Sequence, residues 1–333
     1  MKYALFAISK GGKELAEKLA VSLDAEVIAA EDGIQQAMAE QWNQVRGLIC
    51  IMSTGIVVRS IAPRITDKKS DPAVVVLDQR GKHVISLLSG HLGGGNELAR
   101  IVAELTGGEA VITTASDTLN LTPLDLWAKS QGLYAARKDM TRASAILVNK
   151  GKLALYSEVI VESLPQGLYT SSDKHHYDII ISPRKIPGRI VFHPQNIVIG
   201  IGCNRNAPAR EFEDALRELL HNLQISPSAI RNLASIDLKN DETGLLEFAE
   251  NNNWSIDFFN RTEINKVSNV EVSSAAMKAV GAIGVAEPCA LLSAAEQQTP
   301  QLFSRKRKWK NITMAMAQAP FTLSAQVLAP QSI

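Results

Sequence analysis

The chain has 333 residues, 46% of them hydrophobic and 21% charged, and its formal net charge is +1. This composition excludes global disorder, and the near-neutral charge argues against a general binder of nucleic acid or other polyanions. The three cysteines, Cys50, Cys203 and Cys289, are far apart and form no CxxC pair, so we expect neither a disulfide framework nor a structural metal site.

No uninterrupted run of about 18 apolar residues occurs, so no membrane-spanning helix is expected. The apolar start at residues 1–8 is too short for a signal peptide and lacks a small-residue cleavage site after it. A cytoplasmic protein fits these features best.

Strand and helix patterns alternate along residues 1–121, which predicts an N-terminal α/β domain. The run 47–52 is continuously apolar, as in a parallel strand covered on both faces. The turn Asp78-Gln-Arg-Gly81 predicts a hairpin between two neighbouring strands. The predicted strands are 3–8, 25–29, 47–52, 73–77, 82–88 and 110–117, and the predicted helices follow residues 12, 34, 53 and 95.

Polar residues follow the strand 47–52 directly. Ser53, Thr54 and Gly55 are predicted at a helix start, with Arg59 one turn later. Arg59 could bind a ligand carboxylate, because open α/β sheets bind ligands beyond the carboxyl ends of their strands. The alternative is an ordinary capped helix with a solvated arginine.

A glycine-rich turn links the strand 82–88 to the next helix. Asn96 is a candidate cap of that helix, and its N-terminus would attract anions. The alternative is a tight turn whose polar groups satisfy one another. The candidate ligand-binding residues of this turn are Ser89, Gly90, His91, Gly93, Gly94 and Asn96.

A third polar strand end contains Thr114 and Asp117. We expect the ends at 53–59, 89–97 and 113–117 to converge on one site, because convergent polar groups in a pocket are typical of ligand binding.

Residues 122–192 are predicted to form a smaller middle segment. The adjacent pair His175-His176 lacks the spacing of helical metal ligands, which favours a solvated loop. The run Pro183–Arg189 contains two prolines and a glycine, so it is predicted to be a linker.

Residues 193–333 predict a second α/β domain. Gly200-x-Gly202 is half of a dinucleotide fingerprint, but Arg205 occupies the place of the third glycine and no Walker motif occurs, so NAD and ATP are disfavoured. Lys239, like Arg205, follows a predicted strand and is a candidate for binding carboxylates. Glu287 precedes Pro288 at a helix start, which explains it structurally and leaves catalysis as the alternative.

Six segments resemble the cobalt-precorrin-5A hydrolase family. They cover nearly the whole chain in the family's order, although the middle segment matches less distinctly and Gly95 stands where alanine is common. The six segments are 55–63, 84–97, 111–117, 199–203, 236–242 and 284–288.

The resemblance implies two α/β/α domains around a smaller middle segment, and a hydrolase of cobalamin biosynthesis. Its substrate would be a cobalt-containing tetrapyrrole with acetate and propionate side chains, one acetate closing a δ-lactone. Water would open the lactone, and the meso carbon would leave with its methyl group as acetaldehyde. The cobalt would enter with the substrate, so no cofactor or metal site of the protein's own is expected.

His91 is the predicted general base, because histidine titrates near neutral pH and a helix N-terminus disfavours the imidazolium. A non-catalytic corrinoid carrier is the alternative, and a phosphate-binding enzyme is a more distant one. We expect neither a nucleic-acid nor a membrane partner. A homodimer is one assembly that fits.

Overall fold

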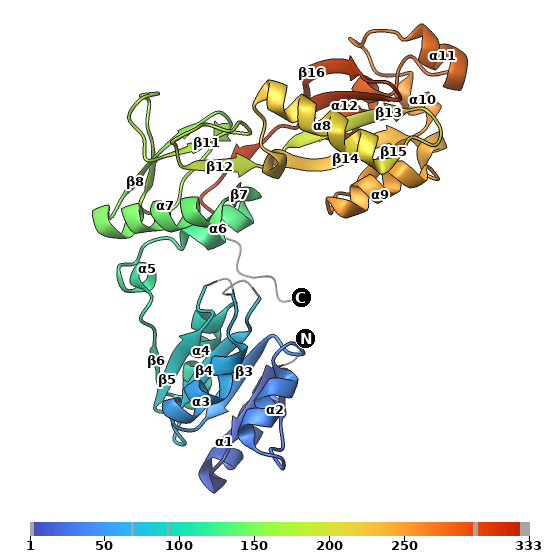
Figure 1. Cartoon of the computed structure of the whole chain (residues 1–333). Coiled ribbons are helices and arrows are strands. Elements are labelled where there is room, and N and C mark those ends of the chain that lie inside the picture. Colours follow the sequence, from blue (N-terminus) through green and yellow to red (C-terminus); the bar gives the residue numbers. More distant parts are fainter. Residues whose placement is uncertain (1–2, 68–69, 92, 296–298, 327–333) are drawn as a thin grey trace. The chain divides into compact units, whose positions relative to one another are not determined.

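The computed structural model describes residues 3–67, 70–91, 93–295 and 299–326 (Figure 1). They form two compact units, one ending at Trp127 and the other running from Ala128 to Gln326. The first unit contains one sheet flanked by helices and the second contains several, which confirms the predicted α/β class.

The first unit is built on a six-stranded sheet with the order β2-β1-β3-β4-β5-β6. Strands β1 to β4 are parallel, β5 is antiparallel to β4, and β6 is parallel to β5. The strands are β1 (Tyr3–Ala7), β2 (Ala25–Val27), β3 (Gly47–Ile51), β4 (Ala73–Leu77), β5 (His83–Leu88) and β6 (Glu109–Val111).

The reversal between β4 and β5 arises from the hairpin that the sequence predicts. The Asp78 carboxylate accepts hydrogen bonds from the backbone N–H groups of Arg80 and His83, both at 2.8 Å. Gly81 has a φ of +68°, a conformation that glycine adopts without strain. The strands β5 and β6 therefore point the other way, and their carboxyl ends lie on the side of the sheet where β3 begins, away from the carboxyl end of β3.

Successive side chains on each strand point to opposite faces of the sheet, and a layer of helices covers each face. Leu5, Ile49 and Val75 pack on the side of α1 and α4, whereas Phe6 and Leu48 pack on the side of α2 and α3. The helices are α1 (Lys10–Ser22), α2 (Ile34–Gln41), α3 (Thr54–Ile61), which runs into a 3-10 turn η1 (Ala62–Arg64), and α4 (Gly95–Thr106).

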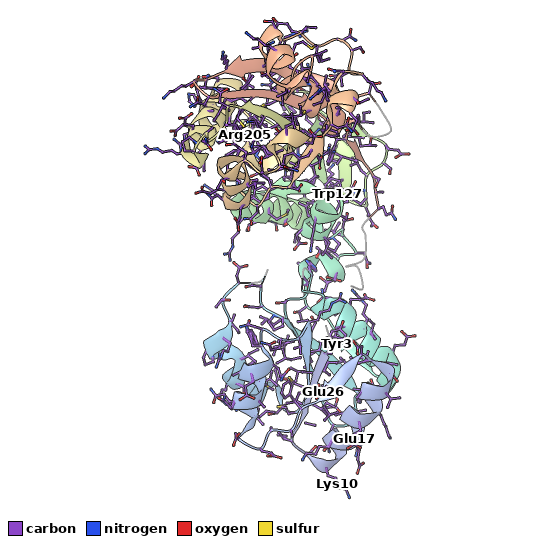
Figure 2. The ribbon with its side chains drawn as sticks, turned by 90° about the vertical axis from the view of Figure 1, so that its right-hand side faces the viewer. Tyr3, Lys10, Glu17, Glu26, Trp127 and Arg205 are labelled. Atoms are coloured by element: carbon purple, nitrogen blue, oxygen red, sulfur yellow. The ribbon has the colours of Figure 1, made fainter. Side chains whose placement is uncertain are left out.

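The segment after β6 differs from the predicted strand 110–117. The strand ends at Val111, and α5 (Ala115–Thr118) follows after Thr114. Helix α6 (Leu124–Ser130) then begins after Pro123 and contains Trp127, which is fully buried (Figure 2).

The second unit begins with a five-stranded sheet of order β10-β8-β11-β12-β7, in which only β7 is antiparallel to its neighbour. Residues 183–189 connect β11 to β12 inside this sheet, so the prediction of a linker there is wrong. The Ser226 N–H donates to the Pro183 backbone oxygen, and the Lys185 N–H donates to the Gln224 backbone oxygen. These bonds attach the connection to the segment that leads into β14 (Ile230–Ile236). The elements are β7 (Leu133–Ala135), α7 (Arg137–Lys150), β8 (Leu153–Ser157), β9 (Ile160–Val161), β10 (Leu168–Thr170), β11 (Ile179–Ile181) and β12 (Val191–Pro194).

The other sheet of this unit has the order β15-β14-β13-β17-β16, with β13 to β15 parallel and β16 and β17 antiparallel. Helices α8 and α9 cover one face, and α12 packs on the other. Its strands are β13 (Ile197–Cys203), β14 (Ile230–Ile236), β15 (Ile256–Phe259), β16 (Gln301–Lys308) and β17 (Ile312–Gln318). Its helices are α8 (Ala209–Leu223), η2 (Pro227–Ala229), η3 (Asp237–Lys239), α9 (Thr243–Asn251), α10 (Arg261–Ile264), α11 (Ser274–Val280) and α12 (Ala286–Ala294).

The last described strand, β18 (Thr322–Leu323), leaves this sheet and pairs in parallel with β9 of the middle segment. None of the helices in the described ranges is both long enough and apolar enough to cross a bilayer.

Candidate active site

The glycine-rich loop between β5 and α4 folds tightly on itself. Ser89 has a φ of +55°, its hydroxyl donates to the Asp71 backbone oxygen at 2.9 Å, and its own backbone oxygen accepts from Gly95 N–H at 3.0 Å. A Cβ atom on Gly93 would lie 2.4 Å from the Ser89 Cβ. The loop's own packing therefore requires glycine at position 93, whatever the loop binds.

Asn96 is not the cap of α4, because Gly94 occupies the N-cap position in a left-handed conformation. Instead the buried Asn96 side chain links three elements. Its Oδ1 accepts from Ser86 Oγ at 2.7 Å, and its Nδ2 donates to Thr114 Oγ1 at 3.0 Å and Asp117 Oδ2 at 2.9 Å.

His91 lies between two carboxylates. Its Nε2 is 3.0 Å from Asp117 Oδ2 and 3.1 Å from Ser116 Oγ, and its Nδ1 is 3.3 Å from Asp125 Oδ1. The side chains of His91, Asp117 and Asp125 are 17%, 15% and 14% exposed. We call His91, Ser116, Asp117 and Asp125 the His91 cluster.

The electrostatics of the cluster favour a protonated ring. The hydrogen bond with Asp125 raises the pKa of His91, Asp117 raises it further, and partial burial opposes both. Burial also acts to raise the pKa of Asp117, but hydrogen bonds from His91 and Arg100 outweigh it and lower that pKa overall. The prediction that the helix N-terminus keeps His91 neutral is therefore wrong, because two adjacent carboxylates outweigh the partial charge of a helix end.

Arg205 and Lys239 meet on one buried carboxylate in the second unit. Lys239 Nζ is 3.3 Å and Arg205 Nη1 is 3.6 Å from Glu242 Oε2, and Arg205 also pairs with Asp241. Lys239 and Glu242 are almost completely buried, whereas Arg205, labelled in Figure 2, is exposed. Arg205 and Lys239 are predicted to bind the carboxylates of a ligand. Carboxylates of the protein itself, on Asp241 and Glu242, already neutralise part of their positive charge.

Glu287 is 2% exposed, and both of its oxygens have backbone partners. Oε1 accepts from Lys306 N–H at 2.9 Å and Oε2 from Glu271 N–H at 3.3 Å, with Arg305 Nη1 at 3.6 Å from Oε2. These contacts join α12 to β16 and favour the structural interpretation of Glu287.

Gly200 has a packing role in place of a dinucleotide-binding one. A Cβ atom there would lie 1.9 Å from the Ala286 backbone oxygen, whereas at Gly202 the nearest atom would be 3.4 Å away. The glycine at position 200 lets α12 approach β13 closely, and Gly202 faces a hollow that also contains Lys239.

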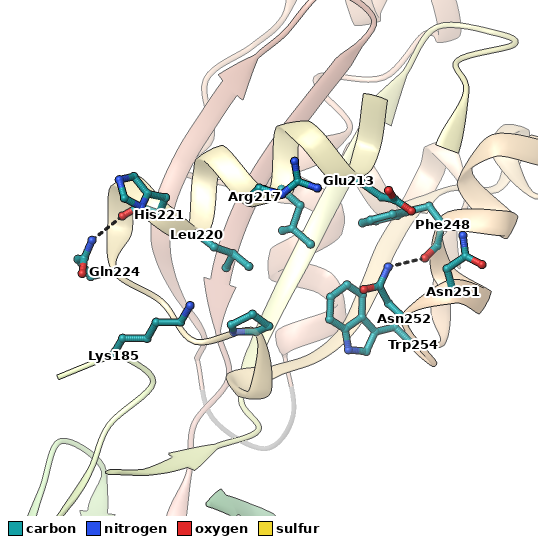
Figure 3. Close-up of a pocket in the computed structure, with 12 residues that line it drawn as sticks. Lys185, Glu213, Arg217, Leu220, His221, Gln224, Phe248, Asn251, Asn252 and Trp254 are labelled. Carbon is teal, nitrogen blue, oxygen red and sulfur yellow. Dashed lines mark hydrogen bonds between the residues drawn. The ribbon is translucent and has the colours of Figure 1, made fainter. Parts of the chain in front are cut away.

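A separate hollow of about 520 Å³ lies over α8 and α9 (Figure 3). Two of its side chains donate hydrogen bonds to backbone oxygens, Gln224 Nε2 to His221 and Asn252 Nδ2 to Phe248, each at 2.8 Å, and Arg217 pairs with Asp214. Because these amide groups are used to satisfy helix carbonyls, the hollow offers no better candidate for catalysis than the His91 cluster.

Three family models match the chain in succession: Cobalamin synthesis G N-terminal over residues 36–117, Cobalamin biosynthesis central region over 122–194, and Cobalamin synthesis G C-terminus over 197–317. A cobalt-precorrin-5A hydrolase from Priestia megaterium is 33% identical, over 96% of this chain and 95% of the relative. The chain belongs to the cobalt-precorrin-5A hydrolase family.

A second cobalt-precorrin-5A hydrolase, from Salmonella typhimurium, is 35% identical over 74% of this chain and 78% of its own length. A solved structure, described as a putative cobalamin biosynthesis protein G homolog from Sulfolobus solfataricus, matches 95% of this chain and 97% of its own, with 22% identity and a TM-score of 0.37.

In this member of the cobalt-precorrin-5A hydrolase family, two of the three predicted strand ends come together. The loop 89–96 meets Thr114 and Asp117 through Asn96 and His91. Ser53, Thr54, Gly55 and Arg59 follow β3 at the other edge of the sheet, so the prediction that they join this site is wrong. The Arg59 guanidinium instead folds back toward Gly55 of its own helix.

Three residues of the site were missed as candidates. Arg100 lies one helical turn after Asn96, so its place beside Asp117 follows from helical spacing. Ser116 lies in the polar run that contains Asp117 and Thr114. Asp125 contacts His91 only because the chain folds back after α5, and no local pattern indicates this. Within the described ranges, no three His, Cys, Asp or Glu side chains are placed to hold a metal ion.

Proposed function

We infer that this chain is a hydrolase of cobalamin biosynthesis that acts on cobalt-precorrin-5A. Full-length similarity to a relative of that name carries this conclusion. The His91 cluster supports it, because a histidine held between carboxylates is suited to proton transfer.

The proposed reaction begins with water attacking the δ-lactone of the substrate. The ring-opened product then loses its meso carbon and the attached methyl group as acetaldehyde, giving cobalt-precorrin-5B. The small-molecule substrate brings its own cobalt, so the proposal requires no resident cofactor. Cytoplasmic location and homodimer formation stay predictions.

We assign two proton transfers to His91. As the lactone opens, the imidazolium donates a proton to the departing oxygen, which becomes a hydroxyl group on the meso carbon. The attacking water releases its own protons to the solvent as its oxygen becomes part of the new carboxylate. The neutral ring can then take the proton of that hydroxyl as acetaldehyde forms, and the electron pair of the broken carbon–carbon bond stays with the macrocycle. Asp125 and Asp117 hold the ring and stabilise its charged form. Glu287, whose oxygens are occupied, is left a structural role.

The test is to mix cobalt-precorrin-5A with the purified chain and measure acetaldehyde. A hydrolase releases one acetaldehyde per substrate over many turnovers. Binding of the corrinoid without acetaldehyde would favour the carrier alternative and contradict the proposal.

A further inference from the structure

A hollow of about 410 Å³ lies at the carboxyl ends of β13 and β14 in the second unit. Because β17 is antiparallel to β13, pairing Cys203 with Ile312 and Gly202 with Thr313, the turn between β16 and β17 lies at the same edge. We call this hollow the lysine pocket. Its basic residues are Lys239, Lys306, Lys308 and Lys310.

One wall of the lysine pocket is apolar and made of small side chains. Helix α11 contributes Ala275, Ala276 and Ala279, and Val285 follows before α12. Small side chains at these positions leave the space open, and their methyl groups offer contact area to an apolar ligand surface.

Another part of the lining is basic. Lys306 pairs with Glu271, with 3.3 Å between Nζ and Oε2, and Lys239 pairs with Glu242. Lys308 and Lys310 are exposed, and within the described ranges no carboxylate lies within ion-pair distance of either. Trp309 between them is fixed by hydrogen bonds from its ring N–H to Glu218 and from its backbone N–H to Ile312.

We propose that the lysine pocket binds one edge of the tetrapyrrole, with Lys308 and Lys310 contacting its carboxylates and the alanines contacting the apolar ring. This inference rests on the proposed function. A pocket of this volume lies within the range of ligand sites, and a lining that combines lysines with small apolar side chains suits an apolar ring edged with carboxylates.

Binding to the intact chain is measured by visible absorbance with cobyrinic acid, a cobalt corrinoid with free carboxylates, and with its fully amidated neutral form. The double variant Lys308→Ala/Lys310→Ala should bind the acid roughly two- to thirtyfold more weakly, as expected for two exposed charge pairs. Its binding should also depend less on salt. The matched control, Lys174→Ala/Lys266→Ala, removes two exposed lysines of the same unit outside the pocket.

A second pair of variants tests the apolar wall. Ala279→Phe should fill the pocket and weaken binding of the acid, whereas Met277→Phe, on the same helix but outside the pocket, should not. Unchanged affinity in the lysine double variant, or equal affinity for acid and amide, would overturn the proposal. Because binding is measured without turnover, these results are independent of the acetaldehyde assay that tests the proposed function.

Discussion

The His91 cluster and the lysine pocket both lie where strands end and helices begin, yet they are built from opposite charges. In the cluster, two carboxylates surround one titratable ring and raise its pKa. In the pocket, the lining contains four lysines and two glutamates together with small apolar side chains. On the two proposed assignments, proton transfer and the binding of anionic side chains are separated along the chain.

The largest effect is expected at His91. His91→Ala should still bind the corrinoid but release acetaldehyde about 10²- to 10⁴-fold more slowly in single-turnover experiments, because the proton-transfer group is gone. His83→Ala, which changes an exposed histidine at the start of β5, is the control. Weaker binding with near-normal turnover at saturating substrate would instead make His91 an anchor for a propionate and end the separation of roles.

The next effect concerns the glycines near the lysine pocket. Gly200→Ala should destabilise the second unit by about 1–3 kcal/mol, because the new methyl group overlaps the Ala286 backbone oxygen. Gly202→Ala, with 3.4 Å to its nearest neighbour, should leave stability almost unchanged and narrow the pocket. Thermal unfolding of the two variants checks this, and equal stabilities would contradict the packing explanation.

The smallest effect is a change in pH dependence. The first, acid-assisted step needs the imidazolium, so its rate should fall as pH rises through the raised pKa of His91. Asp125→Asn removes the largest influence raising that pKa, and the decline should move to lower pH. For each unit that the pKa falls, the rate on the alkaline side drops about tenfold. Single-turnover pH profiles measure this, and an identical profile in the variant would show that Asp125 does not set the protonation of His91.

The sequence predicted the central strands well, because runs such as 47–51 and 73–77 are buried on both faces. The prediction that residues 53–59 join the site was wrong, and the sequence itself contained a pattern that contradicts it. The turn at Asp78–Gly81 predicts a hairpin, and a hairpin reverses direction, so the end of β5 cannot share an edge with the end of β3.

Other features could not be obtained from local patterns. Asn96 followed by Glu97 is typical of a helix start, but Gly94 takes the cap position and frees Asn96 to link β5 with the segment after β6. The protonation preference of His91 depends on Asp125, which is distant in sequence. The activity was inferred from the family resemblance, and the residues alone indicated only a ligand site in an α/β protein.

The pairing of β18 with β9 has a consequence for synthesis on the ribosome. Ile160 and Val161 emerge long before Thr322 and Leu323, their partners in the finished protein. The first unit has all the strands of its sheet once β6 has emerged, whereas β9 lacks its partner strand until residues 322–323 have been made. During the synthesis of the residues between them, β9 is where a nascent chain of this protein would be open to mispairing.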